Sequence, residues 1–205
     1  MLKKSLQVND QSLIEEVLNE VGYGVLALYG DKPYAVPVNF VYFNDSIYFH
    51  SSPKGKKIQL MKNNNQASFN VVSNPQLIPS YYTSDEGLAC PATSFFKSII
   101  IDGRVEIVEP LEEIRDSFTA LMKKLQPEGK YKSFESDEYF KEFKALLVLK
   151  INIDEMTAKF KFGQMLQWDR YQLLLQNLQA SDKESDKTTL KWVERFYKRK
   201  NPNHQ

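Results

Sequence analysis

The sequence is short of the residues that build cross-links and metal sites. Its 205 residues include one cysteine, Cys90, and two histidines, His50 and His204. A single cysteine excludes an intramolecular disulfide, and no cysteines or histidines are paired at the spacing of a zinc site. We therefore expect no resident metal, and the cysteine usage suits a reducing compartment.

Long hydrophobic runs are also missing. No apolar stretch approaches the roughly 18 residues of a membrane span, and the N-terminal MLKKSLQVNDQS lacks the apolar segment of a signal peptide. Lys and Arg total 27 against 26 Asp and Glu, so bulk charge predicts neither a nucleic acid nor a membrane as partner. We expect a cytoplasmic protein in which any anion site is local.

Familiar catalytic motifs do not fit either. GYGVLA, residues 22–27, matches the dinucleotide fingerprint in letters, but a helix precedes it and a strand follows, the reverse of a Rossmann site. There is no G-x-S-x-G, and Cys90 has no histidine near it in sequence. The sequence therefore predicts neither a Rossmann fold nor a hydrolase.

What the sequence does contain is a series of short β-like runs between amphipathic helices. Hydrophobic periodicity predicts strands over 24–30, 34–43, 46–50, 66–72, 95–109 and 144–154, and helices over 10–22, 55–65, 109–129, 138–143, 169–179 and 186–200. Six strands with a leading helix favour an antiparallel barrel with helices packed outside it. We expect a barrel domain over 1–157, including the N-terminal helix, and a C-terminal helical extension over 158–205.

Three places interrupt this pattern. Pro37, inside the second strand, indicates an edge, a bulge or a broken ladder. Residues 73–94 contain three prolines and no clear period, which predicts a long loop. Asp102-Gly103 fits either a kink within one long strand or the turn of a hairpin.

The segment HSSPKGKK, residues 50–57, is the strongest local sign of a binding site. It places three lysines around Gly55 where a strand gives way to a helix. A helix N-terminus presents unpaired N–H groups and a positive dipole end, so cations there are unfavourable unless an anion lies between them. The segment fits either a solvated basic turn or an anion site completed by the hydroxyls of Ser51 and Ser52.

The surrounding motifs narrow this choice. P-V-N-F is followed by I-Y-F-H-S-x-x-x-G-K-K, then by a helix ending in asparagines and the strand SFNVV, all within residues 34–72. This stretch resembles the FMN-binding split-barrel proteins, which include the pyridoxamine 5′-phosphate oxidases and, closer, the 5-nitroimidazole-reductase (Nim) type. ATSFFKSIIIDGRVEIVE resembles their next core strand, and the resemblance covers about 24–153.

The resemblance implies a mainly β protein with flanking helices (α+β), folded as an antiparallel six-stranded split β-barrel. It also implies a homodimer with two FMN sites at the subunit interface. In such a site the backbone of Val38, Asn39 and Phe40 would lie beside the isoalloxazine ring. The ribityl-phosphate side would be lined by His50, Ser51 and Ser52, and the phosphate would be held by Lys56 and Lys57. Four further residues would lie near the flavin, namely Thr93, Ser94, Phe96 and Ser98. An aromatic from residues 81–96 or the tail, such as Trp168, is expected from the partner chain.

His50 is the candidate catalytic residue, with two interpretations. It ends a strand, so it fits a structural histidine bonded to backbone. It also fits a proton donor or substrate contact beside the flavin, because imidazole titrates near neutral pH.

The function implied by the resemblance is an FMN-dependent oxidoreductase. It would take electrons from NAD(P)H and reduce a small electrophile such as a nitro compound, a quinone or a flavin. The arginine-rich substrate segment of the oxidase branch is missing near the C-terminus, which argues against pyridoxamine phosphate as substrate.

Two alternatives stay open. A non-enzymatic flavin-binding regulator would touch nucleic acid through the C-terminal basic cluster, although interleaved acidic residues favour a solvated helix. That cluster comprises Lys187, Lys191, Arg195, Lys198, Arg199 and Lys200. A haem-binding split barrel would have only His50 and His204 as iron ligands, which argues against it.

Overall fold

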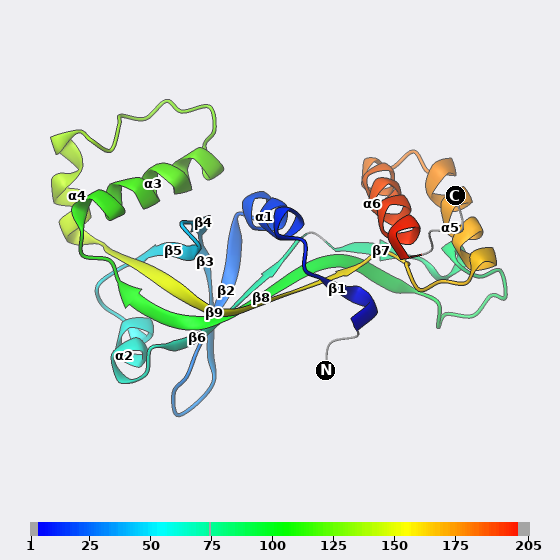
Figure 1. The fold of residues 1–205 in the computed structure, drawn as a ribbon, viewed down its shortest axis with the longest axis horizontal. Helices are drawn as coiled ribbons and strands as arrows, with labels where there is room; N and C mark the ends of the chain where they lie inside the picture. The colour runs from blue at the N-terminus through cyan, green and yellow to red at the C-terminus, as the bar shows by residue number, and fades with distance from the viewer. Residues whose placement is uncertain (1–3, 74, 201–205) are drawn as a thin grey trace. The chain divides into compact units, whose positions relative to one another are not determined.

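The computed structural model of the chain describes residues 4–73 and 75–200. Nine strands and six α-helices lie in these residues (Figure 1). The helices are α1 (Gln11–Glu20), α2 (Lys56–Asn63), α3 (Leu111–Leu125), α4 (Phe140–Ala145), α5 (Trp168–Ala180) and α6 (Glu184–Lys200). The strands are β1 (Gln7–Val8), β2 (Tyr23–Leu28), β3 (Tyr34–Asn39), β4 (Val41–Phe43), β5 (Ser46–Ser51), β6 (Gln66–Val72), β7 (Gln76–Ile78), β8 (Thr93–Ile107) and β9 (Leu147–Lys161).

The strand order shows that the sheet is curled. The strands follow the order β3-β2-β6-β8-β9-β5-β4, with β1 added to β9 and β7 to β8. The pairs β1–β9, β2–β3, β2–β6, β4–β5, β5–β9 and β7–β8 are antiparallel. The two ends of this order, β3 and β4, are separated in the chain by Phe40 alone. The sheet must therefore bend round until its edges approach, which is the predicted antiparallel barrel with an open seam.

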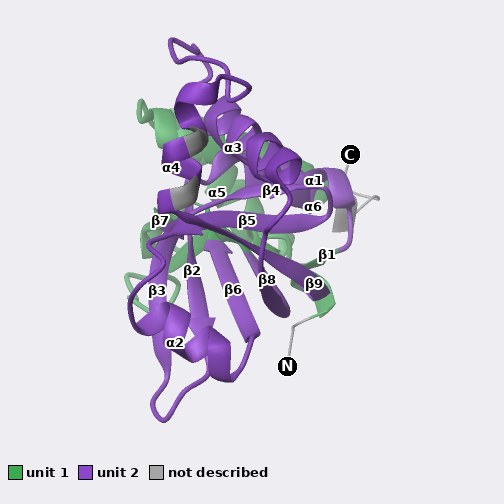
Figure 2. Ribbon diagram, turned by 90° about the vertical axis from the view of Figure 1, so that its left-hand side faces the viewer, with its two compact units in different colours: residues 1–8, 72–98, 158–205 green, residues 9–71, 99–157 purple. Residues whose placement is uncertain are grey.

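The chain divides into two compact units (Figure 2). We call residues 9–71 and 99–157 the barrel unit, and the described residues of 1–8, 72–98 and 158–205 the terminal unit. Strands β8 and β9 each pass from one unit into the other. The predicted site residues are consequently divided between the two units.

Alternation of side chains builds the interior of the barrel unit. Leu26 pairs with Val36 of β3 and Phe69 of β6, while the intervening Val25 pairs with Pro37, so one face of β2 points inward and the other outward. Leu26 and Phe69 are fully buried, whereas Pro37 is exposed. Pro37 thus lies on an edge strand, one of the positions that its missing N–H allows.

Asp102-Gly103 does not form a turn, because β8 runs unbroken through it. A Cβ added to Gly103 would overlap the carbonyl oxygen of Asn152 in β9. Glycine is needed at this position for close approach of the two backbones.

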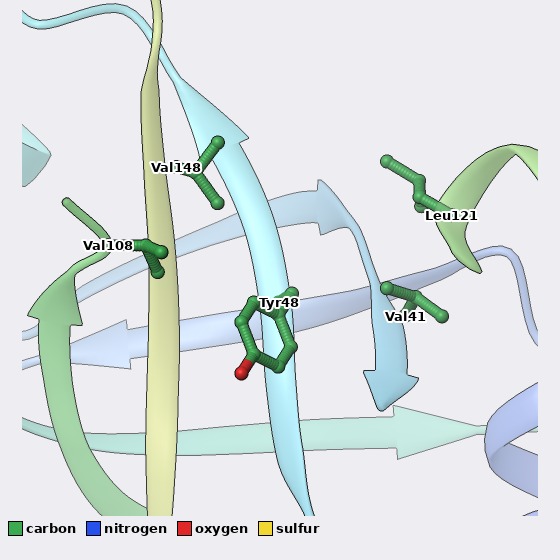
Figure 3. Close-up of a cluster of buried hydrophobic side chains, with 5 residues drawn as sticks. All are labelled: Val41, Tyr48, Val108, Leu121 and Val148. Carbon is green, nitrogen blue, oxygen red and sulfur yellow. The ribbon is translucent and has the colours of Figure 1, made fainter. Parts of the chain in front are cut away.

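A second hydrophobic layer forms where α3 covers the outer face of the barrel. Figure 3 shows its members, Val41 of β4, Tyr48 of β5, Val108, Leu121 of α3 and Val148 of β9. Strand β5 is therefore buried on both faces, since Ile47 and Phe49 alternate with Tyr48 and are themselves fully buried. A strand covered on both sides is a rigid support for the residues that follow it.

Several predicted details are wrong. The predicted strand over 34–43 is two strands, because the link at Phe40 carries the chain from one edge of the sheet to the other. The predicted loop over 73–94 contains β7 and a 3₁₀ turn at Ser80–Tyr82, and β9 continues to Lys161. The described sheet therefore has nine strands rather than six.

The terminal unit is built around aromatic side chains. Phe160 of β9 and Phe162, just after the strand, contact Trp192 and Phe196 of α6 at centroid distances of 5.5–6.4 Å. None of the helices in the described residues is both long enough and apolar enough to span a membrane.

Candidate functional site

The end of β5 and the start of α2 form the centre of the predicted phosphate site. Ser51 is buried and its hydroxyl donates to the carbonyl oxygen of Ser52 at 3.1 Å. The backbone N–H of Lys54 donates to the Ser52 hydroxyl at 3.3 Å. These two bonds shape the turn that leads to Gly55, and the helix starts at Lys56.

Gly55 has a backbone conformation that few other residues adopt. Its φ is 121° and its ψ is 172°, a region populated essentially by glycine. Apart from Gly55 itself and its two neighbours in the chain, no heavy atom lies within 4 Å of the position that a Cβ would take. The turn therefore leaves open space directly before the first turn of α2.

The N-terminus of α2 has no side-chain cap. Its first N–H groups have no partner within the helix, and they share the positive end of the helix dipole with the ammonium groups of Lys56 and Lys57. An anion in the open space would satisfy both the N–H groups and the lysines. The predicted residues thus fit the phosphate end of a mononucleotide.

Both lysines rest on aromatic rings rather than on carboxylates. The Nζ of Lys56 lies 4.9 Å from the ring centroid of Tyr34, and that of Lys57 lies 5.6 Å from the ring centroid of Phe49. Within residues 4–73 and 75–200 neither lysine forms an ion pair. Burial lowers the pKa of Lys57, so a nearby anion would favour its charged form. Sequence reasoning missed Tyr34, which lies on β3 and has no motif of its own.

His50 lies on the face of β5 that turns toward α3. It pairs with Val148 of β9, and its ring centroid is 5.8 Å from that of Phe118 in α3. Burial, and then the charge of Lys57, lowers the pKa of His50 below its usual 6.5. The structure therefore brings His50 within the electrostatic reach of the predicted phosphate lysine and keeps its imidazole neutral at neutral pH.

In the predicted flavin segment, the side chains of Asn39 and Phe40 make contacts within the fold. Val38 pairs with Gly24, and the Asn39 amide donates to the carbonyl oxygen of Gly22 at 3.0 Å. Phe40 is fully buried and meets Phe69 edge-on at 5.1 Å. Only backbone contacts remain possible for Phe40, which is the form in which the contact was predicted.

The carbonyl oxygen of Phe40 accepts a bond from Lys124 of α3 at 2.9 Å. Lys124 carried no signal in the sequence, where it is one of two adjacent lysines on a helix. It is a residue that sequence reasoning missed.

The remaining predicted contacts belong to the terminal unit. Thr93 accepts a hydrogen bond from the ammonium of Lys161, and the Ser98 hydroxyl donates to the carbonyl oxygen of Lys159 at 3.4 Å. Thr93, Ser94, Phe96 and Ser98 are all half-buried along the first part of β8. They form a second group of candidates, and their role as flavin contacts stays a prediction.

Comparison with known families identifies the fold. The sequence model of the family described as Pyridoxamine 5′-phosphate oxidase matches residues 10–160. The chain belongs to this family. The match spans most of the chain, and it includes β5 and α2, which form the candidate phosphate site.

Several solved structures share the fold of this chain. A candidate 5-nitroimidazole antibiotic resistance protein from Bacteroides thetaiotaomicron is 24% identical, with a TM-score of 0.61 over 75% of this chain and 86% of its own. An FAD- and haem-binding protein from Mycobacterium smegmatis is 19% identical, with a TM-score of 0.62 over 76% and 73%. A flavocytochrome from Azotobacter vinelandii is 18% identical, with a TM-score of 0.60 over 78% and 72%. At these identities the likeness establishes the fold, and no functionally curated protein matches the chain.

Proposed function

We propose that this member of the pyridoxamine 5′-phosphate oxidase family is an FMN-dependent oxidoreductase. The observation that carries the proposal is the uncapped start of α2, where Gly55 leaves open space beside Lys56 and Lys57. A helix N-terminus with two lysines and no acidic partner suits a phosphomonoester. The bound flavin would supply the redox chemistry, and the chain would supply orientation and electrostatics.

Each residue of the proposed site has a limited task. Lys56 and Lys57 hold the phosphate as point charges, which tolerates their flexible stems. The Ser52 hydroxyl shapes the turn, and the backbone at Val38 and Asn39 lies along the ring. His50, neutral in the free protein, can accept a proton when an anion binds beside Lys57.

The electron donor we propose is NAD(P)H and the acceptor a small electrophile such as a nitro compound, a quinone or a flavin. A reduced nicotinamide that stacks on the flavin needs no dinucleotide motif, which agrees with the missing Rossmann pattern. Fold similarity to a candidate nitroimidazole resistance protein supports this class of acceptor.

We also propose a homodimer with the flavin at the subunit interface. The outward face of β2 and β3 supports it, because Ala35 and Pro37 are exposed there and Val25 and Ala27 beside them are half-buried. Trp168, which is 43% exposed, is the candidate aromatic from the partner. A solvent-exposed apolar sheet face of this kind is typical of an interface.

The test of the cofactor is purification without added cofactor, followed by an absorbance spectrum and mass identification of what denaturation releases. Flavin bands with FMN support the proposal, whereas released FAD corrects the cofactor and a Soret band favours haem. His50 would then be the one histidine ligand in the described residues, since His204 lies outside them.

The test of the phosphate site is the double variant Lys56→Ala, Lys57→Ala. We expect FMN to bind at least tenfold more weakly, about 1.4 kcal/mol, because both point charges at the phosphate are lost. The matched control is Lys32→Ala with Lys62→Ala, which removes the same charge from a turn and from the far end of α2. Equal FMN affinity in the two double variants, measured by flavin fluorescence titration, would remove the phosphate assignment.

The regulator alternative rests on α6. Lys187, Lys191, Arg195 and Lys198 are exposed on this helix, while the side chains of Arg199 and Lys200 lie outside the described set. Asp186 is turned inward and bonds to Tyr82 and Gln76, but Glu184 is exposed and pairs with Lys187 at 3.5 Å. The face is therefore mixed in sign, which favours the oxidoreductase over a nucleic-acid binder.

A further inference from the structure

Lys124 is a half-buried cation that hydrogen-bonds to two separate parts of the barrel unit. Its ammonium donates to the carbonyl oxygen of Leu18 at 2.8 Å and to that of Phe40 at 2.9 Å. It also lies 3.6 Å from the centroid of the Phe40 ring. In residues 4–73 and 75–200 no carboxylate forms an ion pair with it.

Both carbonyl groups lack a partner in the regular structure. Leu18 is in the last turn of α1, where the carbonyl oxygens find no N–H donor within the helix. Phe40 falls between the registers of β3 and β4, since the first ends at Asn39 and the second begins at Val41. Lys124 therefore satisfies the two acceptors that flank the seam of the barrel, and the negative end of the α1 dipole favours its charge.

The link at Phe40 is fixed from a second side as well. The Asn39 side chain donates to the carbonyl oxygen of Gly22, just after α1. Lys124 and Asn39 thus tie both sides of the same short segment to the end of α1. The two residues that precede the link, Val38 and Asn39, are those proposed to lie along the flavin ring.

We propose that Lys124 is a positioning residue for the flavin, which acts by holding the carbonyl group of Phe40 so that the backbone at Val38 and Asn39 keeps its place. This inference rests on the proposed function. Lys124 does not itself touch the cofactor, so its removal moves the strand rather than deleting a contact.

The hydrogen bonds from Lys124 to the two carbonyl groups should depend on pH. Burial lowers its pKa from 10.5 to about 8. It lines a groove of about 530 Å³ with Asp116 and Lys123 of α3, Tyr42 of β4 and the uncharged Asn19 of α1. As pH rises through 8 the ammonium loses its proton, and bonds to a charged donor become ordinary ones of roughly half the strength. Flavin should then be held less firmly.

The experiment is a titration of FMN fluorescence between pH 7 and 9 with the full chain and three variants, Lys124→Gln, Lys124→Arg and the control Lys123→Gln. We expect the dissociation constant of Lys124→Gln at pH 7 to rise about tenfold and to change less with pH than that of the unchanged protein. Lys124→Arg, which stays charged, should bind tightly across the range. Lys123→Gln should follow the unchanged protein.

The outcomes separate this inference from the proposed function. Failure of the unchanged protein to bind FMN overturns the proposed function itself. Binding that is equal in Lys124→Gln and Lys123→Gln, with the same pH profile, overturns the role of Lys124 alone and assigns the profile to Lys57. If Lys124→Gln does not fold, a Lys124→Arg variant with the same fall in affinity from pH 7 to 9 as the unchanged protein contradicts the inference.

Discussion

His50 shows how one residue reports on the site around it. Burial and the charge of Lys57 lower its pKa in the folded protein, while an unfolded chain would protonate near 6.5. Below pH 6.5 the unfolded state therefore binds a proton that the folded state does not, so stability is lost as pH falls through that value. An anion bound beside Lys57 would reverse the shift by attracting the proton.

The prediction for His50 is a pKa below 6.5 in the free protein that rises when FMN is added. The chain has two histidines, so the imidazole C–H signals in a proton NMR titration can be assigned with the variant His50→Gln. In that variant the loss of stability between pH 7 and 5.5, measured by urea denaturation, should be smaller. A His50 pKa at or above 6.5 without ligand would show that Lys57 and burial do not act on it.

At the scale of elements, α3 is fastened to the sheet by a polar cluster beside its hydrophobic layer. The same carboxylate oxygen of Glu113, Oε1, accepts a hydrogen bond from the Tyr48 hydroxyl at 2.8 Å and a second one from the ammonium of Lys150 at 3.0 Å. Burial raises the pKa of Glu113, but the bonds from Tyr48 and Lys150 and the charge of Lys150 outweigh it, so the net pKa is lowered. The carboxylate thus stabilises the docking of α3 above its usual pKa of 4.5.

We expect Glu113→Gln to cost roughly 2 kcal/mol of unfolding free energy at pH 7, the scale of a charge-assisted bond lost between partly buried groups. The cost should shrink as pH falls below 4.5, since protonated Glu113 loses the same advantage. Glu112→Gln is the matched control, because Glu112 is exposed on the same turn of α3. Equal unfolding free energies for the two variants in urea denaturation would show that the cluster does not hold the helix.

Across the whole molecule, the sequence patterns predicted correctly those helices and strands that depend on neighbouring residues. Alternation in β2 and the helical face of α3 gave the correct elements, and the motif around Gly55 gave the correct strand-to-helix junction. The break at Phe40 was missed because both sides of it are ordinary strand sequence, and only closure of the barrel requires it. Strand β7 was missed because its partner is the distant start of β8, and pairing of distant residues leaves no periodic signal in three residues.

The same limit applies to the site. Lys56 and Lys57 stand in a motif, so the sequence predicted them, whereas Lys124 acts through a contact 84 positions away in the chain. In the sequence Lys124 looks like an exposed lysine on a helix, and only the fold shows that it contacts the carbonyl group of Phe40.

Self-association is tested at the scale of the whole molecule, because we propose that a second copy of the chain completes the flavin site. The outward face of β3 is the proposed interface, and Ala35 is exposed on it near the start of the strand. An added charge there would be buried without a partner in a dimer but solvated in a monomer, so Ala35→Glu should shift the equilibrium toward monomer. FMN affinity should fall with it, since each site would lose its partner residues.

Sedimentation velocity with and without FMN measures both effects. The control Gln176→Glu adds the same charge at an exposed position of α5 and should leave the dimer intact. An unchanged protein that sediments as a monomer at micromolar concentration would contradict the dimer directly. A dimer that persists in Ala35→Glu with full FMN affinity would place the interface on another face.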